Sequence, residues 1–209
     1  MVTNEEFVEY LTSLFPDAFC ELKFNSNFEL LVAVILSAQC TDKRVNMVTE
    51  VLFKQLSTPR DFANVKQEDL EQKIKSCGFY HNKAKNIINC AKEITEKYNG
   101  EVPSDFDTLT TLAGVGRKTA NVVCSVAFGQ NRIAVDTHVL RVSNRLGFTC
   151  SNNPDICEMD LTKRFKNNLD KLHYRMVLFG RYHCKAIKPE CSMCKLKEDC
   201  KYYKSINNK

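Results

Sequence analysis

The sequence predicts an all-α protein built from about ten short helices, and three observations carry that prediction. Gly and Pro together supply only 12 of 209 residues, about half of their usual share. Apolar residues recur at helical spacing in several segments, and no two segments alternate apolar and polar residues as half-buried strands do. The composition, 44% hydrophobic and 26% charged, is that of a globular chain long enough to bury a core of its own.

Each helix is expected from a start signal, an apolar stripe or an end signal. Ser, Thr, Asp and Asn are typical N-caps, Pro is tolerated in the first turn, and Gly is common just past the last turn. The clearest stripe, in 81–98, places Ala84, Ile87, Ile88, Ala91 and Ile94 on one face. The other expected boundaries are, in chain order, Thr3 with Glu6 in a capping box, Asn27 before the apolar run 28–40, Thr41 or Asp42, Thr58-Pro59, an end at Asn99-Gly100, Ser104 with Asp107, the glycine turn in 112–116, Asp136 before a helix ending at Gly147, the polar turn 151–160 and a segment at 169–183.

Two features bear on location. The longest apolar run, 28–40, is shorter than the roughly 18 residues that a membrane helix needs. The N-terminus begins with an acidic stretch and shows no signal peptide. The sequence therefore predicts a cytoplasmic protein with no membrane partner.

Charge is unevenly distributed along the chain. Residues 161–209 hold 13 Lys and Arg against 4 Asp and Glu, whereas the preceding 160 residues hold 17 against 21. A basic C-terminal quarter on a slightly acidic body favours a polyanionic partner such as nucleic acid. A solvated lysine-rich surface is the alternative that charge alone leaves open.

Cysteine is unusually frequent, with 11 residues. Cys184, Cys191, Cys194 and Cys200 follow the spacing C-x6-C-x2-C-x5-C, and four thiolates this close suit tetrahedral zinc or an iron–sulfur cluster. The spacing does not decide between the two metals. Lys185 and Lys188 lie between the first two cysteines, where a pinned loop could present them to phosphates. The other seven cysteines are expected to be small buried hydrophobes.

A glycine turn, LAGVG, separates two expected helices and is followed by Arg117-Lys118. Gly114 and Gly116 allow a tight turn with exposed N–H groups, which together with the next helix N-terminus can hold a phosphate. The glycine spacing is not that of a P-loop. An ordinary turn between helices is the alternative, and the two basic residues favour DNA binding.

Lys118 and Asp136 are candidate catalytic residues. A lysine in the first helical turn, beside Arg117, meets positive charge that disfavours its ammonium form, so it could be a nucleophile. A lysine that only binds phosphate would occupy the same place. Asp136 begins a helix after the apolar residues 133–135; it could cap that helix, stabilise a cationic sugar or shuttle protons, and these roles are compatible.

These motifs, in this order, resemble the endonuclease III family of helix–hairpin–helix DNA glycosylases. The matching stretches are 31–46, 78–87, 112–123, 135–146 and the four-cysteine tail. The resemblance implies two helical lobes: a six-helix domain over 22–132 with the helix–hairpin–helix at about 104–128, and a second lobe of 1–21 plus 133–209. The cluster loop would span 184–200.

The resemblance also implies the site. Lys118 and Asp136 would be catalytic, and the four cysteines would hold a [4Fe–4S] cluster. Gln39 would fill the space of an extruded nucleotide and Phe79 would be the apolar wedge. The expected DNA-contacting residues are Gln39, Phe79, Gly114, Gly116, Arg117, His138, Lys185 and Lys188. Two positions depart from the family pattern: Ala113 replaces a hairpin proline, and Phe79 replaces a leucine.

The implied activity is that of a bifunctional DNA glycosylase/AP lyase. It would remove oxidised pyrimidines from damaged duplex DNA and cut 3′ to the abasic site through a lysine Schiff base. We expect a monomer associated with the nucleoid through DNA. A DNA-binding module without chemistry is the competing class, and borohydride trapping on abasic DNA separates the two. An electron carrier is disfavoured, because ferredoxin cysteines are more tightly spaced and repeated.

Overall fold

The computed structural model describes residues 2–207. These residues form twelve α-helices, three 3₁₀-helices and no strand, so the all-α expectation is confirmed. The chain divides into two compact units. Unit 2 is the continuous stretch 21–129, and unit 1 combines the described parts of 1–20 and 130–209.

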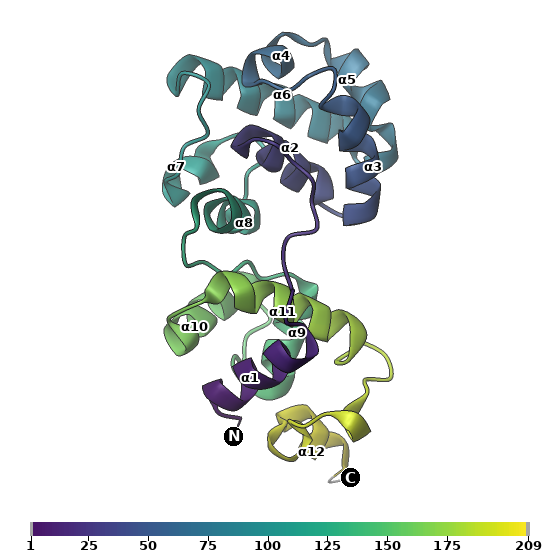
Figure 1. The fold of residues 1–209 in the computed structure, drawn as a ribbon, viewed down its shortest axis with the longest axis vertical. Helices are drawn as coiled ribbons and strands as arrows, with labels where there is room; N and C mark the ends of the chain where they lie inside the picture. The colour runs from purple at the N-terminus through teal and green to yellow at the C-terminus, as the bar shows by residue number, and fades with distance from the viewer. Residues whose placement is uncertain (1, 208–209) are drawn as a thin grey trace. The chain divides into compact units, whose positions relative to one another are not determined.

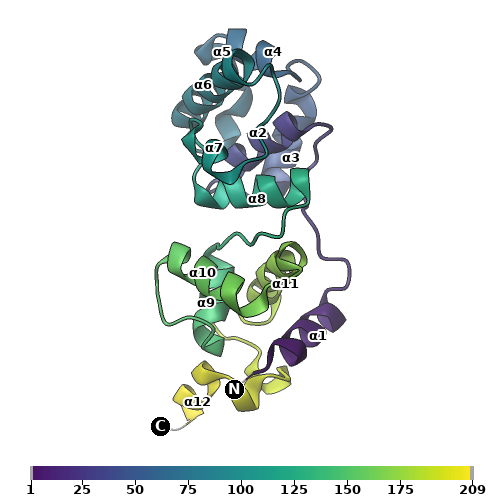
Figure 2. The same ribbon diagram turned by 90° about the vertical axis from the view of Figure 1, so that its left-hand side faces the viewer.

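Unit 2 is organised around one buried helix, α2 (Asn27–Ser37), in which every residue from Phe28 to Leu36 is buried. It packs against α8, α3 and α6, and Figures 1 and 2 show it among these helices. The long helix α6 also packs against α4 and α5. The remaining helices are α3 (Asp42–Leu52), α4 (Pro59–Asn64), α5 (Gln67–Ile74), η1 (Lys75–Cys77), α6 (Tyr80–Lys97), α7 (Phe106–Thr111) and α8 (Arg117–Phe128).

Unit 1 brings the N-terminal helix onto the C-terminal part of the chain. Phe7 of α1 lies edge-on to Phe148, with ring centroids 4.8 Å apart, and α11 packs against both α1 and α9. The same core includes Cys200 and is contacted by Cys184 and Cys194. Its helices are α1 (Asn4–Leu14), α9 (Thr137–Leu146), α10 (Pro154–Phe165), α11 (Leu169–Tyr182), η2 (Cys191–Met193), η3 (Lys197–Asp199) and α12 (Lys201–Asn207).

Most helix starts lie where the cap residues predict them. Thr3 and Glu6 form the expected capping box, and Thr41 caps α3. Two starts differ from expectation: Ser26 rather than Asn27 caps α2, and Asp105 rather than Ser104 caps α7. In both, the side chain of the residue directly before the helix accepts from the third helical N–H.

The scattered cysteines are not all buried. Cys77, Cys90, Cys124 and Cys157 are, and burial raises the pKa of the Cys90 thiol to about 12. Cys20 and Cys40 are half-exposed and Cys150 is exposed, so the expectation of seven buried cysteines is wrong. Cys150 follows the buried residues Phe148 and Thr149 but is itself exposed, and its Sγ lies 3.8 Å from Nζ of Lys201.

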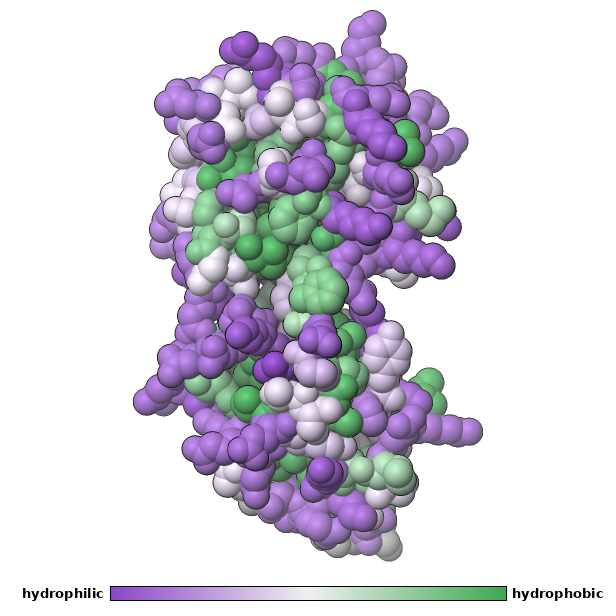
Figure 3. Space-filling view, viewed as in Figure 1, coloured by the Kyte–Doolittle hydropathy of each residue, from purple (hydrophilic) through white to green (hydrophobic). Residues whose placement is uncertain are grey.

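No helix within residues 2–207 is both long enough and apolar enough to cross a membrane. Polar side chains cover most of the face seen in Figure 3, and the apolar surface is limited to smaller patches.

Candidate functional site

The glycine turn forms a hairpin of α7, the loop 112–116 and α8. Gly114 has φ +78°, and a Cβ there would come within 2.8 Å of the Asn86 Cβ on α6. Gly114 therefore supplies both a left-handed backbone and a close approach to α6. Leu112 and Val115 are buried beneath the loop, which leaves both glycines at the surface.

At the N-terminus of α8, basic side chains lie beside backbone N–H groups that no N-cap side chain contacts. Gly116 is its N-cap residue, so no side chain caps the helix. Arg117 and Lys118 are exposed in its first turn, and the Arg117 guanidinium lies 5.0 Å from the centre of the Phe106 ring. N–H groups without a side-chain cap, the positive helix end and two cations are together suited to hold an anion.

Asp136 is the N-cap of α9, as its position predicts. Its Oδ1 accepts from the N–H of His138 at 2.9 Å and from that of Val139 at 2.8 Å. The carboxyl is half-exposed, although residues 133–135 before it are buried. Both capping bonds end on one oxygen, which leaves the capping role compatible with chemistry at the other. Lys118 is carried by unit 2 and Asp136 by unit 1.

His138 is held by neighbours on α9 and α11. Its Nδ1 lies 3.1 Å from Nη2 of Arg141, and Arg141 also donates to the carbonyl oxygens of Gly180 and Cys184. A Cβ on Gly180 would lie 2.8 Å from the His138 Cβ, so glycine lets α11 approach α9 here. Burial lowers the pKa of the Arg141 guanidinium. The His138 ring is half-exposed.

Gln39 and Phe79 occupy two short loops of unit 2 with unusual backbones. Gln39 follows α2 and has φ +53°; Phe79 directly precedes α6 and has φ +48°. Both side chains are exposed, and that of Phe79 is 64% accessible. An exposed aromatic ring on a left-handed backbone is uncommon and indicates a functional constraint.

The four C-terminal cysteines line one pocket of unit 1. Its wall also includes the apolar side chains of Leu146 and Phe179, with Tyr202 and Tyr203. Burial raises the pKa values of the Cys191 and Cys194 thiols, and the neighbouring cysteines add to the effect. Within residues 2–207, no three His, Cys, Asp or Glu side chains converge as they would around a single metal ion.

Arg145 of α9 fixes the start of this four-cysteine segment (184–200). Its guanidinium donates to the carbonyl oxygens of Lys185 at 2.6 Å and Ala186 at 3.0 Å, and it lies 3.4 Å from Cys184 Sγ. It also stacks over the Tyr202 ring at 4.2 Å. The positive charge of Arg145 also opposes the rise in the pKa of the Cys191 thiol that burial causes.

Lys185 and Lys188 differ in their surroundings. Lys185 is half-exposed, and its Nζ is 2.6 Å from the Glu190 carboxylate. That hydrogen bond from Lys185 holds the pKa of Glu190 below its usual range. Lys188 is exposed and has φ +51°. Sequence reasoning did not anticipate the ion pair, which gives Lys185 a competitor for any phosphate.

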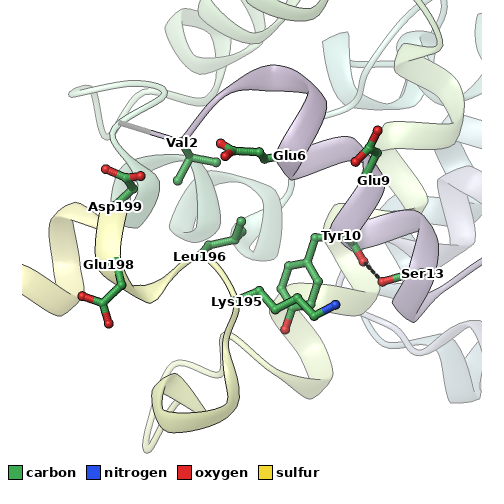
Figure 4. A pocket seen from close by; sticks show the side chains of 9 residues that line it. All are labelled: Val2, Glu6, Glu9, Tyr10, Ser13, Lys195, Leu196, Glu198 and Asp199. Atoms are coloured by element: carbon green, nitrogen blue, oxygen red, sulfur yellow. Dashed lines mark hydrogen bonds between the residues drawn. The ribbon is translucent and has the colours of Figure 1, made fainter.

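A second hollow in unit 1 lies between α1 and the segment 195–199 (Figure 4). Glu6, Glu9, Glu198 and Asp199 line it, and Lys195 lies over the Tyr10 ring at 5.8 Å. Four carboxylates repel phosphate, so this hollow is a poor surface for nucleic acid.

Several supporting residues had no clear signal in the sequence. Two of them, Arg141 and Arg145, donate to backbone carbonyl groups of distant segments. The third, Asn86, lies against the backbone of Gly114. Lys83 is buried in α6. The sequence indicated this in part, because Lys83 lies one turn before Ile87 on the apolar stripe of that helix.

Comparisons with known proteins agree with this arrangement. Residues 32–167 match the family model described as HhH-GPD superfamily base excision DNA repair protein. The chain is 52% identical over 197 residues to endonuclease III of Bacillus subtilis (strain 168), covering 93% of this chain and 90% of that protein.

Two solved structures are similar over nearly the whole chain. A non-covalent endonuclease III–DNA complex aligns with a TM-score of 0.92 and 50% identity, covering 100% of both chains. A trapped endonuclease III–DNA covalent intermediate aligns with the same TM-score and identity, covering 99% of this chain and 100% of that one. From these matches, and from the glycine hairpin that carries Lys118, the chain belongs to the HhH-GPD superfamily of base excision DNA repair proteins and, within it, to the endonuclease III family.

Proposed function

We propose that this protein is a bifunctional DNA glycosylase/AP lyase that removes oxidised pyrimidines from duplex DNA. The observation that carries the proposal is the exposed Lys118, in the first turn of an uncapped helix directly after the hairpin glycines. The family of this chain includes an endonuclease III trapped covalently on DNA. A lysine amine is the group in this hairpin able to form such a bond with a sugar carbon.

The hairpin holds the DNA backbone. Exposed amides around Gly114 and Gly116, with the positive end of α8 and Arg117, bind a phosphate and fix the sugar beside Lys118. Such contacts read no sequence. They therefore suit an enzyme that must act wherever damage occurs.

The chemistry begins when the neutral Lys118 amine attacks C1′ of the extruded nucleotide. The bond from C1′ to the base breaks, and the base leaves with that electron pair and takes up a proton from water. The C1′–O4′ bond then opens, O4′ takes the proton that Asp136 received from the amine, and a protonated Schiff base remains between the lysine nitrogen and C1′. Loss of a C2′ proton then expels the 3′ phosphate oxygen, which completes β-elimination.

Asp136 supports this reaction through its charge. In the proposed reaction, it accepts the proton lost by the amine and stabilises positive charge on the sugar. Its Oδ1 is held by two backbone N–H groups, which fixes the carboxyl group. His138, in the first turn of α9, contacts the DNA strand.

Gln39 and Phe79 open the base stack of the DNA duplex. A base must leave the duplex before its glycosidic bond is accessible, and filling the hole offsets the lost stacking. Gln39 fills that hole, and the exposed Phe79 ring enters between neighbouring bases. The protein binds double-stranded DNA with damaged bases or abasic sites, acts as a monomer, and reaches the nucleoid through that DNA.

We further propose that Cys184, Cys191, Cys194 and Cys200 hold a [4Fe–4S] cluster. Four soft thiols on the walls of one largely apolar pocket fit a group with four separate iron corners. When bound, the cluster pins the segment that carries Lys185 and Lys188, which contact phosphates.

Elemental analysis tests the cluster. The purified protein should be brown and hold close to four iron and four acid-labile sulfide per chain. Stoichiometric zinc without sulfide contradicts the proposal. Cys194→Ser should lower the iron content and weaken DNA binding before it alters reaction at Lys118, because Lys118 belongs to the other unit.

Lys118→Gln tests the enzyme. This change keeps a polar end but removes the amine, so base release and borohydride trapping should fall by about a thousandfold or more. Binding to an abasic-site analogue should stay within a few-fold of wild type. If Lys118 only binds phosphate, the Lys118→Arg protein should retain the binding and catalysis that Lys118→Gln loses. That result would refute the assignment of Lys118 as the nucleophile.

A further inference from the structure

A buried lysine in unit 2 joins the two loops that carry Gln39 and Phe79. Lys83 of α6 is only 6% exposed. Its ammonium donates to the carbonyl oxygens of Leu36 at 2.8 Å, Ala38 at 2.7 Å and Cys77 at 2.6 Å. These three oxygens come from two segments about forty residues apart in sequence.

The three acceptors explain why a cation is tolerated there. Leu36 and Ala38 lie at the C-terminal end of α2, where carbonyl groups lack helical partners and the helix dipole is negative. Cys77 ends η1. Burial lowers the pKa of Lys83, and the nearby thiols of Cys77 and Cys40 oppose that shift. Without the ammonium, three carbonyl groups would lose a charged donor.

Two of these three bonds lie close to residues proposed to enter DNA. The Ala38 carbonyl belongs to the peptide group that leads into Gln39, so its orientation is coupled to the φ of +53° there. Cys77 is two residues before Phe79, and the backbone N–H of Lys83 donates to the Phe79 carbonyl at 3.1 Å. One residue therefore contacts the backbone beside Gln39 and at Phe79.

The left-handed backbones need such support. Non-glycine residues at positive φ are disfavoured and persist where surrounding contacts determine them. Two of these residues, with exposed side chains, share a single buried anchor. Without such contacts, the two loops would leave the left-handed backbone conformation. The side chains of Gln39 and Phe79 would then lose their fixed positions relative to each other.

We propose that Lys83 is a positioning residue that sets Gln39 and Phe79 in one fixed arrangement before DNA binds. The inference rests on the proposed roles of those two residues in opening the duplex. Holding both loops in advance removes the entropy of ordering them during base extrusion. Lys83 thus acts on the extrusion step, and the chemistry at Lys118 does not depend on it.

Lys83→Met tests this inference, because it keeps an unbranched chain of similar length and removes all three donors. Single-turnover base release from a duplex with one oxidised pyrimidine should slow between about tenfold and a hundredfold. Borohydride trapping on an abasic site in single-stranded DNA, where no stack must be opened, should stay within twofold. Lys85→Met is the matched control, since it removes a lysine from the exposed face of the same helix.

A fluorescent base analogue opposite the lesion gives an independent readout. In wild type it should report unstacking when the duplex is opened, and Lys83→Met should reduce that signal. A purely structural role would instead lower activity on duplex and single strand alike, which overturns the proposal. If Lys83→Met does not fold, Lys83→Gln, which retains one donor group, takes its place. It should slow base release from duplex and reduce the unstacking signal in the same way, but by less.

A mutant cycle separates this inference from the proposed function. Gln39→Ala with Phe79→Ala should slow release from duplex, and adding Lys83→Met should slow it by no more than about twofold further, because the three residues act as one unit. Additive effects overturn the role of Lys83 alone. If the Gln39 and Phe79 changes leave duplex excision unaltered, their proposed roles fail and the inference falls with them.

Discussion

The Asp136 carboxylate caps α9, and we propose that it also takes part in the reaction. Two backbone N–H groups bind the same oxygen, Oδ1, and this geometry survives replacement of the second oxygen by an amide nitrogen. The cap and the charge can therefore be separated experimentally, since asparagine is as good an N-cap as aspartate.

Asp136→Asn should keep the fold and lose the reaction. We expect thermal stability within about 1 kcal/mol of wild type, while single-turnover base release falls by about a hundredfold to ten-thousandfold. Thr58→Ala removes the N-cap of α4 and provides the control: it should cost about 1 kcal/mol and leave base release unchanged. If the Asp136→Asn protein is instead unstable but normally active per folded molecule, Asp136 only caps α9 and has no role in the reaction.

Single residues of the site differ in how far the sequence reveals them. Asp136 was predicted as a cap because N-caps obey a local rule, and the structure confirms that part. Lys83 lies on a predicted apolar stripe, but its partners are backbone oxygens up to 47 residues away. Backbone acceptors leave no mark in side-chain patterns, so a buried lysine of this kind is found only from the fold.

At the scale of elements, the hairpin depends on its two glycines for different reasons. Gly114 has φ +78° and lies against Asn86, whereas Gly116 has φ −87° and open space where a Cβ would stand. The first is required by the fold. At the second, we infer that the missing side chain leaves room for a DNA phosphate to approach the loop.

Alanine at each position separates these roles. Gly114→Ala should destabilise the protein by about 1–3 kcal/mol through strain and the clash with Asn86, measured by denaturant unfolding. Gly116→Ala should change stability by no more than about 0.5 kcal/mol yet weaken binding to an abasic-site duplex several-fold, because the methyl group obstructs a phosphate. Equal stability losses would contradict this division.

Helices with strong local signals were predicted well, and those without them were missed. α5 begins after Lys66 with no side-chain cap, and α12 has no buried residue, so neither had a start signal or a full apolar stripe. The four-cysteine segment was predicted from spacing alone. Its contact with Arg145 was not, because the two are about forty residues apart and the acceptors are again carbonyl groups.

At the scale of the whole molecule, the basic excess in 161–209 should govern affinity for DNA through counterion release. The two lysines of the four-cysteine segment should not contribute equally. Lys188 is exposed, while Lys185 shares its charge with Glu190 at 2.6 Å.

Salt titrations should resolve that difference. Lys188→Ala should reduce the slope of log affinity against log salt by up to about one, and Lys185→Ala by less. Glu190→Gln should free Lys185 and strengthen binding to undamaged and damaged duplexes alike. Lys97→Ala, at the end of α6 and paired with Glu93, is the control and should leave the slope unchanged. An unaltered slope in Lys188→Ala would show that this lysine does not touch the backbone.

The discontinuity of unit 1 has a consequence for synthesis on the ribosome. Unit 2 is one continuous stretch and can fold as soon as residue 129 has emerged. Helix α1 is made first, but its core partners, among them Phe148 and α11, come more than 130 residues later. The apolar face of α1, with Phe7 and Leu11, therefore stays exposed to solvent while unit 2 folds. During that interval the nascent chain exposes an amphipathic segment, to which we expect chaperones to bind.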